Sequence, residues 1–345
     1  YTRKTRPNGL PVVVNRDRAS KLAAVNILCR VGARNENPAR TGFAHLFEHL
    51  MFRGTRAVEN FDLPVQMASG DNNAFTNNDY TDFYITLPKD NLETALWLES
   101  DRMEGLDITP AKLEAEKKVV IEEFRQRYLN QPYGDQTMLL RALAYKVHPY
   151  RWAAIGLATD HIAGATLADV ESFYRAHYRP SNAILSISAD MEEERMLELA
   201  EKWFAPLADH PSATAAIPQE PVQTQARRQE VERDVPASTV TVAYHMCART
   251  KPDFYTADLV SDLLSGGDSG RLYTHLVKER NLLSSVNAYI TGDVDPGLFV
   301  FTGQLLPGVT PEAAEAAFRE EIEARQTTAA TAYAIEKVKN KIDAN

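Results

Sequence analysis

A strand–loop–helix pattern occurs twice in this chain, and this repetition limits what the chain can fold into. Apolar side chains alternate with polar ones at residues 22–31, which predicts a β-strand, and residues 42–51 then show helical spacing. Three later stretches echo the first half in the same order: 232–234 echoes 15–17, 243–248 echoes 25–30, and 257–263 echoes 44–50. The alternative is chance similarity of two such units. The ordered match favours two related α+β domains.

The boundary between the two domains is predicted from a change in composition. Residues 206–226 contain four prolines among small and polar residues, with no strong hydrophobic period, which is typical of a linker. We therefore expect a first domain at residues 1–205 and a homologous second domain at 227–345. Residues 334–341 have the pattern of the middle of a helix, so the second domain is expected to be incomplete at its C-terminal end.

Composition narrows the classes of function. The formal net charge of the 345 residues is -9, whereas nucleic-acid binding needs a basic face, so no nucleic-acid partner is expected. No run of ~18 apolar residues exists, so no transmembrane helix is expected.

The two cysteines, Cys29 and Cys247, fall at equivalent positions of the two domains and are predicted to be buried free thiols. Sparse cysteines and the missing initiator Met fit a periplasmic location; the mitochondrial matrix and the cytoplasm are the alternatives.

One predicted helix carries the residue types of a metal site. His45 and His49 are four residues apart, so both imidazoles can reach one ion, and Glu48 borders the same helical face. Zinc takes about four ligands, and a catalytic site leaves one position for water. Zn²⁺ lowers the pKa of that water to about 7, and Glu48 would act as the general base. Apolar residues are interleaved with these three, which indicates a packed helix rather than a chance match on an exposed surface.

A third ligand is expected from a second helix, at residues 111–128. Glu116 and Glu123 are seven residues apart, close to two helical turns, so they lie on one face, whereas Glu122 is rotated away. One carboxylate can bind zinc while the other accepts a hydrogen bond from a ligand histidine. The alternative is that both are solvated charges on an exposed face.

Several motifs together resemble those of the M16 family of inverted-zincin peptidases. The H-x-x-E-H segment is followed about 75 residues later by E-x6-E. Four stretches match the family's signature: 42–55, 73–76, 178–183 and 266–272. The resemblance covers nearly the whole chain and is to the zinc-bearing subunits of the family, such as the β subunit of the mitochondrial processing peptidase. It implies two homologous α+β domains, each a mostly antiparallel sheet with helices packed on one face.

The resemblance also implies a role for each residue of the metal site. His45, His49 and Glu123 would be the zinc ligands, Glu48 the general base, and Glu116 the carboxylate that orients a ligand histidine. The function implied is that of a zinc-dependent endopeptidase acting on peptides or unfolded segments. A structural core subunit of a larger complex is the alternative, but such a subunit has no need of the intact set. A metal-binding scaffold without turnover is a third interpretation.

A further stretch of the family's signature bears on the substrate. The resemblance implies that Asn73, Ala74 and Phe75 lie on a sheet edge that pairs with the substrate backbone. Backbone hydrogen bonds carry little side-chain information, so an enzyme with loose sequence preference is expected.

The second domain departs from the family's pattern at two residues that bind the substrate carbonyl, here called the substrate clamp. In the family, the half opposite the zinc supplies an Arg and, seven residues later, a Tyr that hold the substrate carbonyl near the metal. Alignment places Val277 and Ser284 at these positions, and Arg280 is out of register. Valine has no donor and serine is too short. We therefore predict a heterodimer in which a homologous partner subunit supplies the Arg and Tyr; a slipped alignment is the alternative.

Overall fold

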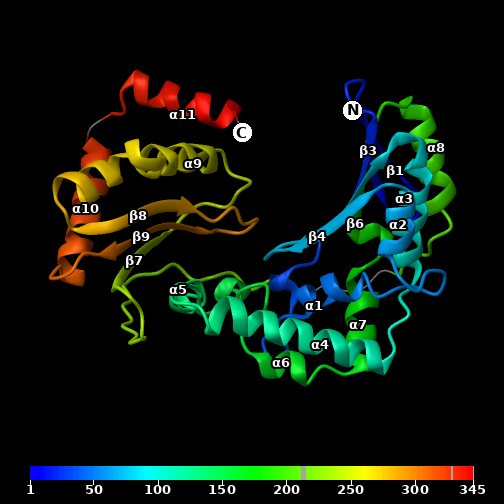
Figure 1. Ribbon diagram of the computed structural model, residues 1–345, viewed down its shortest axis with the longest axis horizontal. Coiled ribbons are helices and arrows are strands. Elements are labelled where there is room, and N and C mark those ends of the chain that lie inside the picture. Colours follow the sequence, from blue (N-terminus) through cyan, green and yellow to red (C-terminus); the bar gives the residue numbers. More distant parts are fainter. Residues whose placement is uncertain (211–214, 328, 345) are drawn as a thin grey trace. The chain divides into compact units, whose positions relative to one another are not determined.

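The chain consists of two compact units, residues 1–226 and 227–345. The structure is a computed structural model that describes residues 1–210, 215–327 and 329–344 (Figure 1). Within the stretch predicted as a linker, residues 211–214 lie outside the described residues, and the others form neither helix nor strand. The first unit ends where that proline-rich stretch ends.

The first unit is built around a six-stranded sheet with the strand order β1-β2-β6-β3-β5-β4. Neighbouring strands are antiparallel except for β2 and β6, which are parallel. The sheet is therefore mostly antiparallel, as predicted. Its strands are β1 (Thr2–Thr5), β2 (Pro11–Arg16), β3 (Leu22–Cys29), β4 (Asp71–Thr76), β5 (Thr81–Pro88) and β6 (Ala183–Ala189).

Strand β3 lies inside this sheet and pairs with β5 on one side and β6 on the other. Its buried side chains, Ala23, Val25, Ile27 and Cys29, alternate with more exposed ones. This is the period-two pattern from which the strand was predicted, because successive side chains of a strand point to opposite faces.

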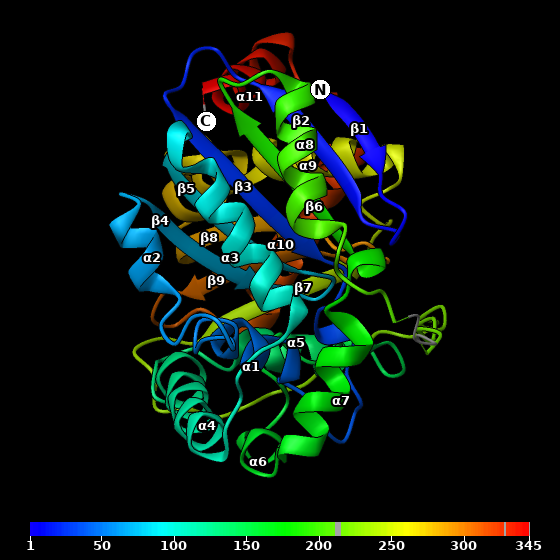
Figure 2. The ribbon, with the colours of Figure 1, turned by 90° about the vertical axis from the view of Figure 1, so that its right-hand side faces the viewer.

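Two long helices cover one face of the sheet (Figure 2). Helix α3 (Leu92–Glu104) packs against β3 and β5, and α8 (Glu193–Phe204) packs against β2 and α3. The short helix α2 (Asp62–Met67) contacts the edge strand β4. Burial of apolar side chains, at roughly 25 cal/mol per Å² of apolar surface, holds these layers together.

The remaining helices of the first unit gather at one end of the sheet (Figure 1). Helix α1 follows β3, and it packs against α4, which in turn packs against α6. This end of the unit therefore brings together the two helices predicted to carry the metal site. The helices are α1 (Phe43–Leu50), α4 (Pro110–Phe124), α5 (Gln136–Ala144), α6 (Thr159–Ala163) and α7 (Leu167–His177).

Helix α4 has a well-defined start and an unusual end. The Thr109 side chain accepts a hydrogen bond from the Lys112 N–H, and Pro110 occupies the first turn, where its missing N–H costs nothing. After Phe124 the chain continues as a π-helix, Arg125–Leu129. The helix predicted at 111–128 is therefore present, but its last turn is wider than an α-helix.

The second unit contains a three-stranded antiparallel sheet with the order β7-β9-β8. The order repeats that of β3-β5-β4 in the first unit: the third strand along the chain lies between the other two. In both units a helix, α1 or α9, follows the first of these strands. The elements are β7 (Thr239–His245), α9 (Pro252–Ser265), a π-helix (Tyr273–Glu279), β8 (Leu283–Ile290), β9 (Leu298–Leu305), α10 (Pro311–Thr327) and α11 (Ala332–Ala344).

The two sequence echoes at 243–248 and 257–263 thus fall on or beside matching elements, β7 and α9. The first echo does not, because residues 232–234 form no strand whereas Asn15 and Arg16 end β2.

Both cysteines are free thiols. Cys29 is buried at the end of β3, as predicted. Cys247 lies two residues beyond β7 and is only half-buried, so its prediction as a buried thiol at the position equivalent to Cys29 was wrong. Among the described residues, no helix combines the length and the apolar character required to traverse a lipid bilayer.

Candidate metal centre

Helix α1 is held in place by apolar packing on most of its surface. Phe43, Leu46, Phe47 and Leu50 are buried, and the Phe47 ring stacks on an aromatic ring of α7 with 5.3 Å between ring centroids. The polar residues of α1 occupy the remaining face, which turns toward α4. A helix packed this firmly presents its histidines in fixed positions, which suits a metal site.

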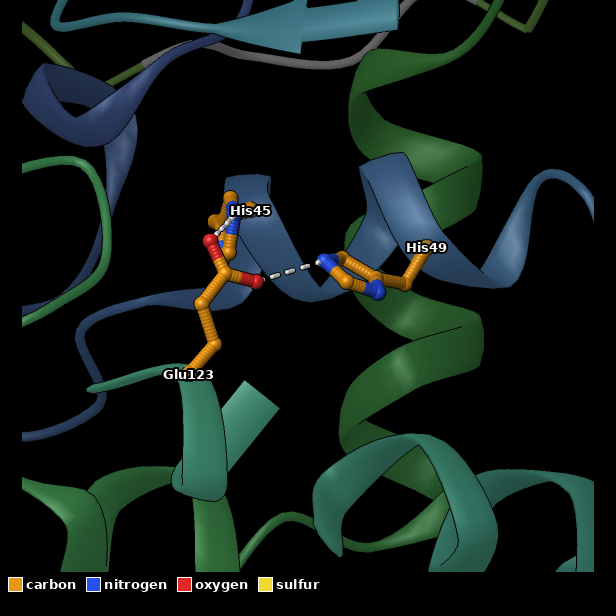
Figure 3. Close-up of side chains that lie close together, drawn as sticks. All are labelled: His45, His49 and Glu123. Carbon is orange, nitrogen blue, oxygen red and sulfur yellow. Dashed lines mark ion pairs between the residues drawn. The ribbon is translucent and has the colours of Figure 1, made fainter. Parts of the chain in front are cut away.

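Three side chains from α1 and α4 converge at this face (Figure 3). Ligand atoms of His45, His49 and Glu123 all lie within 4.8 Å of one another. One carboxylate oxygen of Glu123 is 3.6 Å from His45 Nε2, and the other is 3.3 Å from His49 Nε2. Zinc bonds of about 2.0–2.1 Å in a tetrahedron place neighbouring ligand atoms ~3.4 Å apart. The three side chains therefore fit Zn²⁺, and α1 and α4 bring them together as the sequence suggested.

The two histidines differ in their electrostatic surroundings. Burial lowers the pKa of His45 to about 4, so its imidazole is neutral at physiological pH, the form that binds metal. Burial also acts to lower the pKa of His49, but the neighbouring carboxylates of Glu116 and Glu123 outweigh it and raise that pKa to about 9. The carboxylates that surround His49 thus attract positive charge to this position, a proton or a metal ion.

Glu116 lies beside His49 and is 1% exposed. One of its oxygens is 3.5 Å from His49 Nδ1, an ion-pair distance rather than a normal hydrogen bond, and the other is 2.5 Å from Arg53 Nε. The structure thus places Glu116 beside a ligand histidine, on the ring nitrogen opposite the one that faces Glu123. Arg53 was not singled out in the sequence, because its contact with Glu116 joins residues far apart in the chain.

Removing the Arg53 charge is expected to weaken zinc binding. Arg53→Met leaves the buried Glu116 carboxylate without its cation, and an unpaired buried charge rearranges or takes up a proton. We expect the zinc Kd to rise roughly 10-fold, the lower end of what the loss of a supporting partner costs. Arg56→Met, an exposed arginine of the same loop, is the matched control. Equal zinc affinities of the two variants, by calorimetric titration, would contradict this role.

Arg127 is a second cation beside the cluster. Its guanidinium lies 3.0 Å from Glu123, four residues earlier in the chain. This spacing is the ordinary neighbour distance on a helix surface, so the sequence did contain a signal for this pair. Arg127 lies in the π-helical turn that follows α4.

Glu48 lies next to His49 on α1, and the charges of His49 and Glu123 act on its carboxyl group. It is half-buried on α1, near Thr76 at the end of β4. Burial raises its pKa, and the nearby Thr76 hydroxyl opposes the rise. A carboxylate next to a metal site, with its pKa moved toward neutrality, has the properties of a general base.

The residues predicted to bind substrate lie on β4. Within the described residues this strand is an edge of the sheet and pairs only with β5. Asn73 and Phe75 are exposed, Ala74 is buried, and the Ala74 N–H donates to the Asn73 side chain at 2.8 Å. Edge strands present backbone groups to which an extended peptide can add as a further strand.

The two positions predicted to have lost the substrate clamp lie in the second unit. Val277 is in the π-helix and packs against that unit's core. Ser284 is exposed at an irregularity of β8, where the pairing with β9 shifts between Leu283 and Ser285. Neither side chain can donate a charge-assisted hydrogen bond.

The α+β units, together with paired histidines and a glutamate on adjacent helices, place the chain in the class of metallopeptidases. The chain belongs to peptidase family M16. Residues 11–152 match the model of "Insulinase (Peptidase family M16)", and residues 164–342 match that of "Peptidase M16 inactive domain". The second match agrees with the absence of a second His–Glu–His segment.

Named relatives and a solved structure agree with this assignment. The chain is 33% identical to "Zinc protease PqqE" of Helicobacter pylori over 315 residues, which cover 90% of this chain and 71% of that protein. It is 25% identical to a probable β subunit of the mitochondrial processing peptidase from Arabidopsis thaliana, over 86% of this chain and 57% of that protein. A crystal structure of a protease from Helicobacter pylori superposes with a TM-score of 0.92 at 31% identity, covering 99% of this chain and 84% of that one.

Proposed function

We propose that this chain is the zinc-bearing subunit of a heterodimeric endopeptidase that hydrolyses peptides or unfolded polypeptide segments. The observation that carries the proposal is the convergence of His45 and His49 of α1 with Glu123 of α4, with Glu48 next to His49 on α1. Relatives named as zinc proteases support Zn²⁺ as the metal.

In this proposal each side chain of the site has a separate role. His45, His49 and Glu123 hold the zinc, which supplies Lewis acidity and lowers the pKa of water to about 7. Glu48 removes a proton from the attacking water and delivers it to the departing amine. Glu116 holds the His49 ring by its other nitrogen, which fixes the orientation of that ligand.

The substrate is proposed to bind as an added strand along β4. An extended peptide would replace the local bond from the Ala74 N–H to Asn73 with its own backbone acceptor. Strand β4 also packs against α1, the helix that carries Glu48, so the strand proposed to bind the peptide contacts the helix of the proposed base. Such binding uses hydrogen bonds to the peptide backbone, and it favours unfolded segments over folded domains.

The partner subunit is expected to increase activity strongly. The lone chain has Val277 and Ser284 where a clamp for the substrate carbonyl is needed, and removal of one such donor typically costs about 10²–10³-fold in rate. Adding a homologous subunit with Arg and Tyr at these positions should therefore raise kcat/KM on an unstructured peptide by at least ~100-fold. A partner with that Arg changed to Ala is the control. Full activity of the purified chain alone would refute the heterodimer.

The alternative function is a structural core subunit without catalysis. If the chain is such a subunit, removing zinc or replacing Glu48 would not change the properties of the assembled complex. Peptide hydrolysis that requires Glu48 and is abolished by a zinc chelator excludes it. The periplasm stays a prediction from the sequence, and cell fractionation tests it.

A further inference from the structure

We propose that Glu36 positions the metal-binding helix by capping its N-terminus from outside the helix. This inference rests on the proposed role of α1 as a zinc helix. The proposal makes Glu36 a positioning residue, because its carboxylate accepts hydrogen bonds from Gly42, Ala44 and Trp152 rather than from a proposed metal ligand. It acts through the backbone of α1.

The first turn of α1 lacks a capping side chain of its own. The N-cap residue is Gly42, which has no side chain with which to accept a hydrogen bond from the first turn. The first N–H groups of a helix have no partners inside the helix, so they need acceptors elsewhere. Two oxygens of Glu36 meet this need: one accepts the Gly42 N–H at 2.9 Å and the other accepts the Ala44 N–H at 2.9 Å. Ala44 directly precedes His45, so the cap holds the turn from which that ligand projects.

A capping Ser, Thr or Asp cannot replace Gly42. The backbone at Gly42 has φ +88°, a conformation that favours glycine, and a Cβ there would lie 2.6 Å from the Ile155 carbonyl oxygen. The tight contact with the loop that contains Ile155 thus excludes a local cap. An acceptor from another part of the chain is the remaining way to satisfy this end of the helix.

Glu36 is itself held from a second direction. The indole N–H of Trp152 lies 3.1 Å from a Glu36 oxygen and 3.1 Å from the Ala33 carbonyl. Trp152 is 1% exposed and Glu36 is 6% exposed. Burial raises the pKa of Glu36 to about 8, and the N–H donors of Ala44, Gly42 and Trp152 oppose the rise. A buried acid surrounded by three N–H donors is held in one position, so it also fixes the position of the first turn of α1.

The arrangement also suits the charge at this end of α1. A helix N-terminus carries a partial positive charge, which a carboxylate stabilises. An amide at position 36 has one acceptor oxygen and an NH₂ group, and the NH₂ would face an N–H donor. Glu36→Gln therefore keeps the size of the side chain and removes the two-sided cap.

The test separates zinc binding from folding. Metal-free protein is titrated with zinc by calorimetry at pH 8.5, above the Glu36 pKa, and its thermal unfolding is recorded in parallel. We expect Glu36→Gln to weaken zinc binding about 10- to 100-fold, as loss of a supporting partner does, in protein that is still folded at the titration temperature. The control is Glu99→Gln, another buried glutamate, whose partner Arg102 lies on the same helix α3. It should lower the melting temperature and leave the zinc Kd unchanged.

A second variant, Trp152→Phe, tests the role of Glu36 if Glu36→Gln does not fold. Trp152→Phe keeps one aromatic ring but removes the indole donor, so a smaller rise in the zinc Kd of about 3- to 10-fold is expected from the lost hydrogen bond to Glu36. A Kd equal to that of the wild-type chain in the folded variant would overturn the proposal. If the wild-type chain itself binds no zinc, the proposed function fails instead, and the two failures are thereby distinguished.

Discussion

Replacement of Glu48 by Gln is expected to lower peptide hydrolysis by about 10²–10⁴-fold while zinc stays bound. Gln has the size of Glu, but it cannot accept a proton. The loss should appear in kcat rather than in KM, because Glu48 acts on the proton of the attacking water and not on substrate binding. Steady-state kinetics of the assembled enzyme, with zinc content measured on the same sample, checks both statements.

The matched control for this variant is Glu122→Gln. Glu122 is an exposed carboxylate of α4, directly before the proposed ligand Glu123, and its loss should leave kcat unchanged. A Glu48→Gln enzyme with wild-type kcat would contradict the general-base role. Loss of zinc from this variant would show instead that Glu48 supports the metal.

Replacement of Glu123 by Ala is expected to abolish tight zinc binding. It removes one of three proposed protein ligands and leaves two histidines. Loss of a partner that only supports a ligand raises the zinc Kd by about 10–100-fold, and loss of a ligand itself should raise it further. Binding that is specific to the folded state raises stability, by ~2.7 kcal/mol at a zinc concentration of 100 Kd. Zinc should therefore raise the melting temperature of the wild-type chain and leave that of Glu123→Ala unchanged.

The neighbour of Glu123 again provides the control for this variant. Glu122→Ala removes a carboxylate from the same helix turn but from its exposed face, and it should respond to zinc as the wild-type chain does. A melting temperature of Glu123→Ala that still rises with zinc would exclude Glu123 as a ligand. Equal responses of all three proteins would point to a site elsewhere.

The three proposed ligands could be picked out from the sequence because the spacing within each of the two helices is local. His45 and His49 are one helical turn apart, and the seven-residue spacing of Glu116 and Glu123 places both on one face of α4. Alternation at β3 similarly marked one buried face of a strand. What spacing alone left open was which carboxylate approaches the metal. The structure brings Glu123 to the histidine Nε2 atoms and Glu116 to the Nδ1 side.

The supporting contacts were not accessible in this way because they join distant segments. Trp152 meets Glu36 across 116 positions of the chain, and nothing near Glu36 in the sequence marks it as a helix cap. The prediction for Cys247 failed for a related reason. Its equivalence to Cys29 was drawn from a sequence echo, but β7 ends at His245, and the chain has left the sheet by residue 247.

The most direct test of the metal site is anomalous X-ray scattering at the zinc absorption edge from crystals of the zinc-loaded protein. The site described above predicts one strong peak about 2.0–2.2 Å from the Nε2 atoms of His45 and His49 and from a carboxylate oxygen of Glu123. Absence of a peak at this position, or a peak held by other residues, would contradict it.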